Sequence, residues 1–146
     1  MWPSQSNERS IITSTKVLTN GDTIFNAKGD VQILNLYSEC VTPNGATATT
    51  IQYSITPTVG AATAISGVSA ALTSAVAGTI VVLDGSALST APAVSATSVA
   101  LAQTTRGIIF MEGALKLVVA TGPTTGTWVH YIRYRPLQPG AYVTGV

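Results

Sequence analysis

Ten residues near the end of the chain gather the side chains best suited to chemistry. The stretch WVHYIRYRPL, from Trp128 to Leu137, holds the only histidine, one of two tryptophans, two of five tyrosines and two of seven basic residues. A histidine can move protons, and aromatic rings interleaved with arginines can stack bases and hold phosphates. Strand alternation separates these groups, because it places His130 on one face and both Arg133 and Arg135 on the other.

The two faces of this expected strand differ in character. One is predicted to fill a core: Trp128, His130, Ile132 and Tyr134. The other is predicted to face away from it: Val129, Tyr131, Arg133 and Arg135. A buried histidine needs a hydrogen-bond partner or a place near a strand end. The arginine pair can anchor the carboxylate of a partner or lie solvated on the sheet surface.

No catalytic signature accompanies the histidine. The chain has no GxxxxGK[ST] loop, GxSxG elbow, HExxH or CxxC motif. With one histidine and one cysteine, it also lacks the ligands for a closed zinc site. The six acids show no spacing that would pair them as acid and base: Glu8, Asp22, Asp30, Glu39, Asp84 and Glu112. We therefore expect no catalytic residue, no metal, no cofactor and no enzyme activity.

Charge is scarce in this sequence. Only 9% of the 146 residues are charged, against about 25% in ordinary globular domains. The net charge of +1 provides no field for nucleic acid or an acidic membrane surface, and no apolar run reaches the roughly 20 residues that span a bilayer. We expect neither partner. A Thr-, Ser- and Gly-rich surface can be covered by another protein with little charge desolvation, or it can be a plain solvated β surface.

The cysteine and the N-terminus indicate a cytoplasmic origin. Cys40 is the only cysteine, so no intramolecular disulfide can form, which is compatible with a reducing compartment. It follows an apolar run and is expected to be buried. The start of the chain, MWPSQSNERS, lacks the basic region and apolar block of a signal peptide.

Hydrophobic periodicity predicts strands along most of the chain. In TIQYSIT, Ile51, Tyr53 and Ile55 alternate with polar residues, as in a half-buried strand. The run DVQILNLY changes phase between Ile33 and Leu34, so it is either buried on both faces or interrupted by a bulge. Further strands are expected at Ser10–Leu18, Asp22–Asn26, Thr79–Asp84, Ala93–Leu101, Gly107–Glu112 and Ala114–Ala120.

Turn residues separate these strands at short intervals, among them Asn20-Gly21 and Asn44-Gly45. Such spacing indicates an all-β antiparallel sandwich or barrel with little or no helix. Gly67 to Gly78 is either a weak helix or a long loop, and Pro136 and Pro139 are expected to end the last strand and lead the chain outwards. The length suits one domain. We expect an extended N-terminal arm over residues 1–9 and a single β domain over residues 10–146.

Several segments carry a resemblance to a known group of proteins. In order they are TIFNAKGDVQILNLY, TIQYSITPTVGAATAISG, VVLDGSALSTAP and TTRGIIFMEGALKLVVATGPTTGTWVHYIRYRPLQPGAYV. This order is similar to that of small β-rich virion proteins of tailed bacteriophages, which resemble capsid cement, or decoration, proteins. The similarity runs from about Lys16 to Val143. Its most specific parts are the closing TTGTW…YxPLxxGA pattern and the early IF…GDVxIL hairpin.

The resemblance implies a jelly-roll-like antiparallel domain on the outer face of a phage head, assembled in the host cytoplasm. Such a protein associates with itself, as a homodimer or homotrimer, and ties neighbouring major capsid proteins together. Aromatic and arginine residues near the two ends of the chain are the expected subunit contacts: Trp2, Arg9, Arg133, Arg135 and Tyr142.

Two other functions are open to this sequence. The first is a phage tail component or head-to-tail adaptor, which has the same structural character but a different place on the virion. The second is a carbohydrate-binding β-sandwich module, in which an exposed Trp128, Tyr131 or Tyr142 would form the sugar platform.

Overall fold

The computed structural model describes residues 7–95, 107–122 and 125–146. This part of the chain contains eleven strands and no helix. The strands are β1 (Arg9–Ile12), β2 (Thr23–Lys28), β3 (Val31–Thr42), β4 (Thr50–Pro57), β5 (Thr63–Ala64), β6 (Ile80–Val82), β7 (Ala93–Ser95), β8 (Ile108–Phe110), β9 (Gly113–Ala120), β10 (Thr127–Pro136) and β11 (Tyr142–Gly145).

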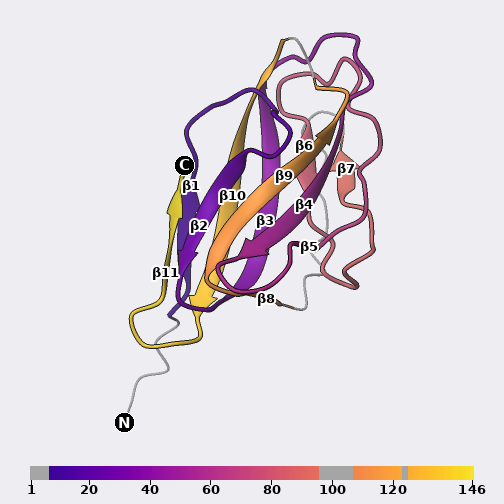
Figure 1. The fold of residues 1–146 in the computed structure, drawn as a ribbon. Helices are drawn as coiled ribbons and strands as arrows, with labels where there is room; N and C mark the ends of the chain where they lie inside the picture. Colours follow the sequence, from indigo (N-terminus) through magenta and orange to yellow (C-terminus); the bar gives the residue numbers. More distant parts are fainter. Residues whose placement is uncertain (1–6, 96–106, 123–124) are drawn as a thin grey trace.

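The strands form two antiparallel sheets that pack face to face (Figure 1). The first, here the β3 sheet, has the order β1, β10, β3, β6, β7, and β8 also pairs with β3. The second, here the β9 sheet, has the order β11, β2, β9, β4, β5. The two sheets confirm the prediction of an all-β antiparallel sandwich. The sheets pack together because the alternating apolar residues on each need a shared interior.

The core lies between the sheets and is built from the alternating residues that the sequence displays. Ile51, Tyr53 and Ile55 of β4 are buried, as is Cys40 of β3. Trp128 is the largest fully buried side chain, and its indole Nε1 donates a hydrogen bond of 2.9 Å to Oδ1 of Asn44. A buried indole N–H needs such an acceptor.

A bulge in β3 explains the phase change in DVQILNLY. Arg133 of β10 lies opposite Asn35, but the next residue, Tyr134, lies opposite Ile33, so Leu34 is the extra residue on β3. Ile33 and Leu36 consequently both point into the core. Of the two possibilities that the sequence left open, the structure shows the bulge.

Several boundaries differ from the sequence-based expectations. Residues 67–78 form loops and turns rather than a helix. The strand expected over Ser10–Leu18 is limited to β1, followed by an isolated bridge between Lys16 and Trp128. Ala93–Leu101 begins with the short β7, and its remainder lies outside the described residues.

Both ends of the chain also pair more closely with the sandwich than expected. Arg9, assigned to the N-terminal arm, begins β1 and lies opposite Tyr134. The chain does not lead outwards after Pro139, because β11 returns to pair with β2. The buried side chains of Ala141 and Val143 explain this return, since each removes apolar surface from water.

Three turns are joined by one polar cluster at the end of the sandwich where β2, β8 and β10 finish. Glu112 accepts a hydrogen bond of 2.8 Å from the backbone N–H of Gly29, whose φ of +74° suits glycine. Asp30 accepts bonds from the backbone of Glu112 and from the side chain of Gln138. The hydrogen bond from Gly29 and, after it, the contact with Lys28 hold the pKa of the Glu112 carboxyl below its usual value.

Asn44 provides a test of how far this core depends on a single polar side chain. Its amide nitrogen also donates to the carbonyl of Leu72. Asn44→Ala therefore leaves the buried indole N–H without an acceptor, while the Leu72 carbonyl keeps only its bond from the backbone N–H of Ala75. We expect a loss of about 1–3 kcal/mol in the free energy of unfolding, measured by urea denaturation. Asn26→Ala, the same change at an exposed position of β2, should cost less than about 0.5 kcal/mol. Equal losses in the two variants would contradict this role of Asn44.

Candidate functional site

Three polar side chains meet in the middle of the sandwich. His130 of β10 lies opposite Ser38 of β3, and its Nδ1 is 2.6 Å from Ser38 Oγ. Ser38 Oγ is in turn 2.7 Å from the hydroxyl of Tyr53 on β4, in the opposite sheet. The three residues are fully buried. A serine bonded to a histidine is the arrangement of an activated nucleophile, so this cluster is the first candidate for a site.

Proton placement in this cluster is determined by its far end. The Tyr53 hydroxyl donates to the backbone carbonyl of Val81 at 3.3 Å, so it accepts the hydrogen bond from Ser38. In this arrangement Ser38 accepts from His130, which carries its proton on Nδ1. Every hydrogen-bonding proton of the three side chains then has an acceptor. The lone pair of His130 Nε2 is left over, and it is the one buried side-chain polar atom without a partner in the described residues.

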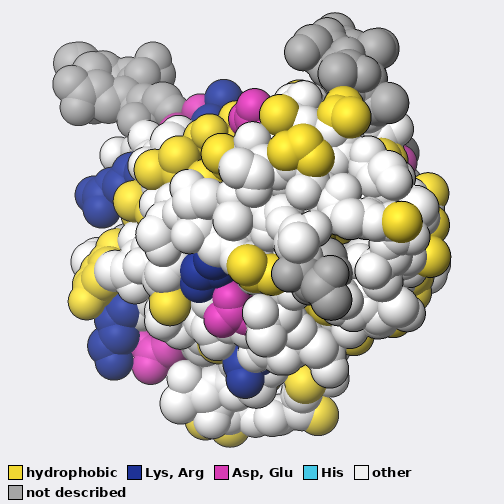
Figure 2. Space-filling model, turned by 90° about the horizontal axis from the view of Figure 1, so that it is seen from above, with side chains coloured by type: hydrophobic (Ala, Val, Ile, Leu, Met, Phe, Trp, Pro, Cys, Tyr) yellow, Lys and Arg dark blue, Asp and Glu magenta, His cyan; other side chains and the backbone are white. Residues whose placement is uncertain are grey.

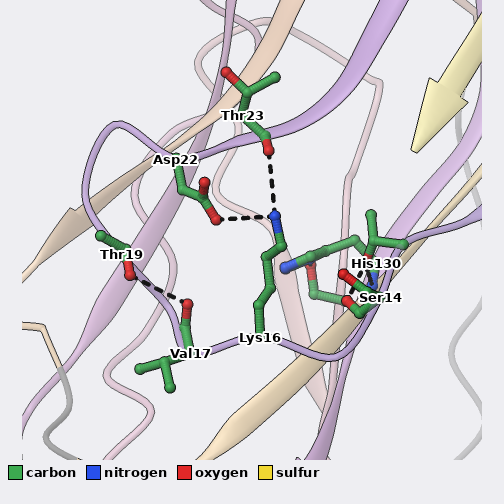
Figure 3. A network of polar contacts seen from close by, with 9 residues as sticks. Ser14, Lys16, Val17, Thr19, Asp22, Thr23 and His130 are labelled. Atoms are coloured by element: carbon green, nitrogen blue, oxygen red, sulfur yellow. Dashed lines mark hydrogen bonds and ion pairs between the residues drawn. The ribbon is translucent and has the colours of Figure 1, made fainter. Parts of the chain in front are cut away.

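Burial keeps His130 neutral. The loss of solvation, followed by the nearby charge of Lys16, lowers the pKa of His130 to about 3. Figure 3 shows the His130 ring beside the Lys16 side chain, whose Nζ is directed away to Asp22 at 3.2 Å and to the carbonyl of Thr23. Burial also raises the pKa of Tyr53. The cluster therefore does not titrate near pH 7.

The geometry of this cluster suits stability rather than turnover. His130 and Ser38 are 0% exposed, so a substrate could not reach them without separation of the sheets. The third member of the chain is a tyrosine rather than the carboxylate that stabilises a protonated histidine in serine hydrolases. Within the described residues, no group of three or more His, Cys, Asp or Glu side chains is placed to hold a metal ion.

The outward face of the β3 sheet is the second candidate. Here the register of β1, β10 and β3 sets side chains in cross-strand rows. Ile12, Tyr131 and Tyr37 form one row, here the aromatic row, and Ser10, Arg133 and Asn35 form the next. The rings of Tyr37 and Tyr131 are stacked, with centroids 4.6 Å apart and planes 15° apart. The two rows line an open groove of about 420 Å³.

The arginines of this face share one carboxylate. Glu8 lies 3.6 Å from Arg133 and 3.2 Å from Arg135, measured between guanidinium nitrogens and carboxylate oxygens. One negative charge against two positive charges leaves this end of the groove cationic. Exposed ion pairs contribute little to stability, so the pair of arginines is available for another contact.

A second, polar groove lies between the start of the described chain and the loop that joins β10 to β11. It is lined by Asn7, Arg9 and residues 136–141, so the N-terminal segment runs beside the loop between β10 and β11. Leu137 in this loop is 48% exposed, and Tyr142, the first residue of β11, is 46% exposed. These are large apolar side chains at a position where the fold does not need them.

The structure brings together some of the expected contact residues. Arg133 and Arg135 share the outward face, as the alternation predicted, and Arg9 lies at the start of the neighbouring strand. Tyr142 belongs to the other sheet. Trp2 lies outside the described residues. Trp128 is fully buried, so the expectation that it could form a sugar platform is wrong.

Sequence reasoning missed half of the outward face. Tyr37, Ile12 and Glu8 were not singled out, because each joins the face only through strand register. One signal was available for Tyr37: beyond the phase change in DVQILNLY it alternates with the buried Leu36 and Ser38. No pattern in the sequence placed Glu8 beside two arginines that are more than a hundred residues away.

Uncharged side chains dominate the surface seen from one end of the sandwich, with small apolar groups scattered among them (Figure 2). Comparisons of the chain with protein-family models, with curated proteins and with solved structures find no match. No helix in the described part of the chain is long and apolar enough to cross a membrane. Function must therefore be inferred from the geometry.

The buried histidine predicts acid sensitivity. His130 takes up its proton at about pH 3 in the folded protein but at about 6.5 in an unfolded chain. At pH values between these two pKa values, unfolding is accompanied by the uptake of a proton. The free energy of unfolding therefore falls as the pH is lowered through this range. At 1.36 kcal/mol per pH unit, we expect a loss of about 2 kcal/mol between pH 7 and pH 5.

Urea denaturation at several pH values measures this slope. Because the chain has a single histidine, few other groups titrate between pH 5 and pH 7. His130→Asn keeps a donor for Ser38 and cannot be protonated in this range, so its stability, although lower at pH 7, should be nearly constant over the window. The same slope in both proteins would rule out His130 as the cause.

Proposed function

We propose that this protein is a structural virion protein: a capsid cement protein that binds the outer face of a tailed-bacteriophage head. It associates with itself and with the major capsid protein, and it stabilises the contacts between neighbouring capsid subunits. It is made in the host cytoplasm and acts on the surface of the assembled particle. The proposal rests on the resemblance of the sequence and on the features that follow.

The observation that carries the proposal is that the start of the described chain lies beside the loop between β10 and β11, at one end of the sandwich. Asn7 and Arg9 lie along the loop between β10 and β11, where Leu137 and Tyr142 are exposed. Exposed aromatic, aliphatic and arginine side chains are the types that anchor protein interfaces. In our proposal, residues 1–6 extend the same contact onto a second subunit.

The uncharged surface supports the same function. A lattice partner can cover Thr, Ser and Gly side chains without stripping water from many charges, which would otherwise cost binding energy. A protein that binds only the assembled lattice stabilises that state by mass action. Many symmetry-related copies on one particle add avidity.

The buried cluster around His130 is consistent with a passive role. The groups that could react are locked inside the core in a neutral network. What remains on the surface is suited to contact rather than to chemistry.

Phage heads that lack this protein provide the direct test. We expect the purified chain to bind them and to raise their melting temperature by several degrees. Deletion of residues 1–6 together with Leu137→Ser should weaken binding at least tenfold, because each removes an anchor worth about 1–2 kcal/mol. The deletion stops before Glu8 so that its contacts with Arg133 and Arg135 remain. Val118→Ser, at an exposed position of β9, is the matched control.

Other outcomes separate the alternatives. Regular density over the capsid faces in electron micrographs supports a cement protein, whereas a single ring at one vertex or along the tail indicates an adaptor or tail component. Binding to glycans that is lost on Tyr131→Ala, by a protein that ignores heads, indicates the carbohydrate-binding module.

A further inference from the structure

The outward face of the β3 sheet has an ordered distribution of charge. The aromatic row of Ile12, Tyr131 and Tyr37 crosses three strands at its middle. Arg133 lies two residues from this row on β10, toward the end that also holds Arg135. Glu39 lies two residues from it on β3, toward the opposite end. The face is therefore apolar at its centre, cationic on one side and anionic on the other.

The two charged sides are not balanced within the chain. On the cationic side, Glu8 offsets only one of two arginines. On the anionic side, no cation of the described residues lies within ion-pair distance of Glu39. Glu39 stands close to the aromatic row, since its charge, after burial and the neighbouring Tyr131, helps to raise the pKa of Tyr37.

Such a face is complementary to itself. We infer that it is a two-fold contact between two copies of this chain, in which one aromatic row packs on the other and Arg133 of each copy meets Glu39 of its partner. The two-fold axis lies in the interface and runs across the strands over the Tyr37 and Tyr131 pair. It reverses the strand direction of the second copy, so the cationic side of each faces the anionic side of the other.

Charge selects this orientation over the other face-to-face arrangement. An axis running along the strands would keep their directions parallel and bring Arg133 near Arg133 and Glu39 near Glu39. Like charges in an interface cost binding energy. The aromatic row supplies the apolar centre in either case, with Ile12 54% exposed at its end.

The size of the face predicts a weak dimer. The four residues of β1 and roughly eight on each of β10 and β3, with strands about 4.8 Å apart and 3.4 Å per residue, give a flat area of about 330 Å². Stable interfaces bury about 800 Å² on each partner. We expect a dissociation constant of about 10–100 μM. Such weak dimerisation becomes significant when copies are concentrated on a lattice.

This inference makes the self-association in the proposed function specific, but its test needs no capsid. Sedimentation velocity of the full chain from about 1 μM to 1 mM should show a reversible equilibrium of monomer and dimer. Glu39→Arg places arginine against Arg133 at both ends of the dimer, and Arg133→Glu places glutamate against Glu39. Each single variant should remain monomeric where the original chain dimerises.

An equimolar mixture of the two single variants is the decisive measurement. The Glu39→Arg chain then has arginine at both contact positions and the Arg133→Glu chain has glutamate at both, so they should form a one-to-one dimer at least as tight as the original. The double variant Glu39→Arg/Arg133→Glu should dimerise with itself. If Arg133→Glu folds poorly beside Glu8, Glu39→Arg alone keeps the test valid, because it leaves Glu8 and its arginines unchanged. Lys116→Glu, on the β9 sheet, is the matched charge-reversal control.

Three results would overturn the inference: an original chain that stays monomeric at 1 mM, single variants that associate as the original does, or a mixture that fails to associate. A chain that dimerises as described but does not bind phage heads keeps this inference and contradicts the cement function. A chain that binds phage heads but remains a monomer supports the cement function and contradicts this inference.

Discussion

The pairing of β10 with β3 is the contact on which the other features depend. It runs from Val31 to Thr42 on one strand and from Thr127 to Pro136 on the other. On the inner face it sets His130 beside Ser38, where Tyr53 of the opposite sheet completes a hydrogen-bonded link between the layers. On the outer face the same register stacks Tyr131 on Tyr37. One ladder of backbone hydrogen bonds thus fixes both the neutral polar centre of the core and the aromatic row on the outward face.

Polar groups in the core make the arrangement specific at a cost. An apolar core would hold two sheets together in many relative positions, because the hydrophobic effect has no direction. The bonds from Ser38 to Tyr53 and from Trp128 to Asn44 are directional and are satisfied in only one alignment of their partners. This alignment buries Nε2 of His130 without a hydrogen-bond partner, and the lost solvation of that atom is its remaining free-energy cost. A rigid, uniquely aligned sandwich is what a protein needs if it is to present surfaces with fixed geometry to a symmetric partner.

Local patterns predicted the strands and their faces but not their partners. Alternation in TIQYSIT and WVHYIRYRPL assigned most buried and outward residues, since it depends only on the two-residue repeat of a strand. The exception is Val129, which was expected to face away from the core but is buried. The phase change in DVQILNLY indicated a bulge as one of two possibilities. Sheet order and register depend on contacts between distant segments, and no local signal reports them. The aromatic row, the place of Glu8 and the return of β11 were therefore beyond the sequence alone.

The position of β10 between β1 and β3 also has a consequence for the order of events during synthesis. β1 leaves the ribosome before the other ten strands described, yet its partner in the sheet is β10, which follows it by more than a hundred residues. Until residue 136 has emerged, β1 has no neighbour, and one edge of β3 is open to strands of other molecules. We expect the sandwich to close only after β10 has left the ribosome, in a slow step that joins β1 to β10.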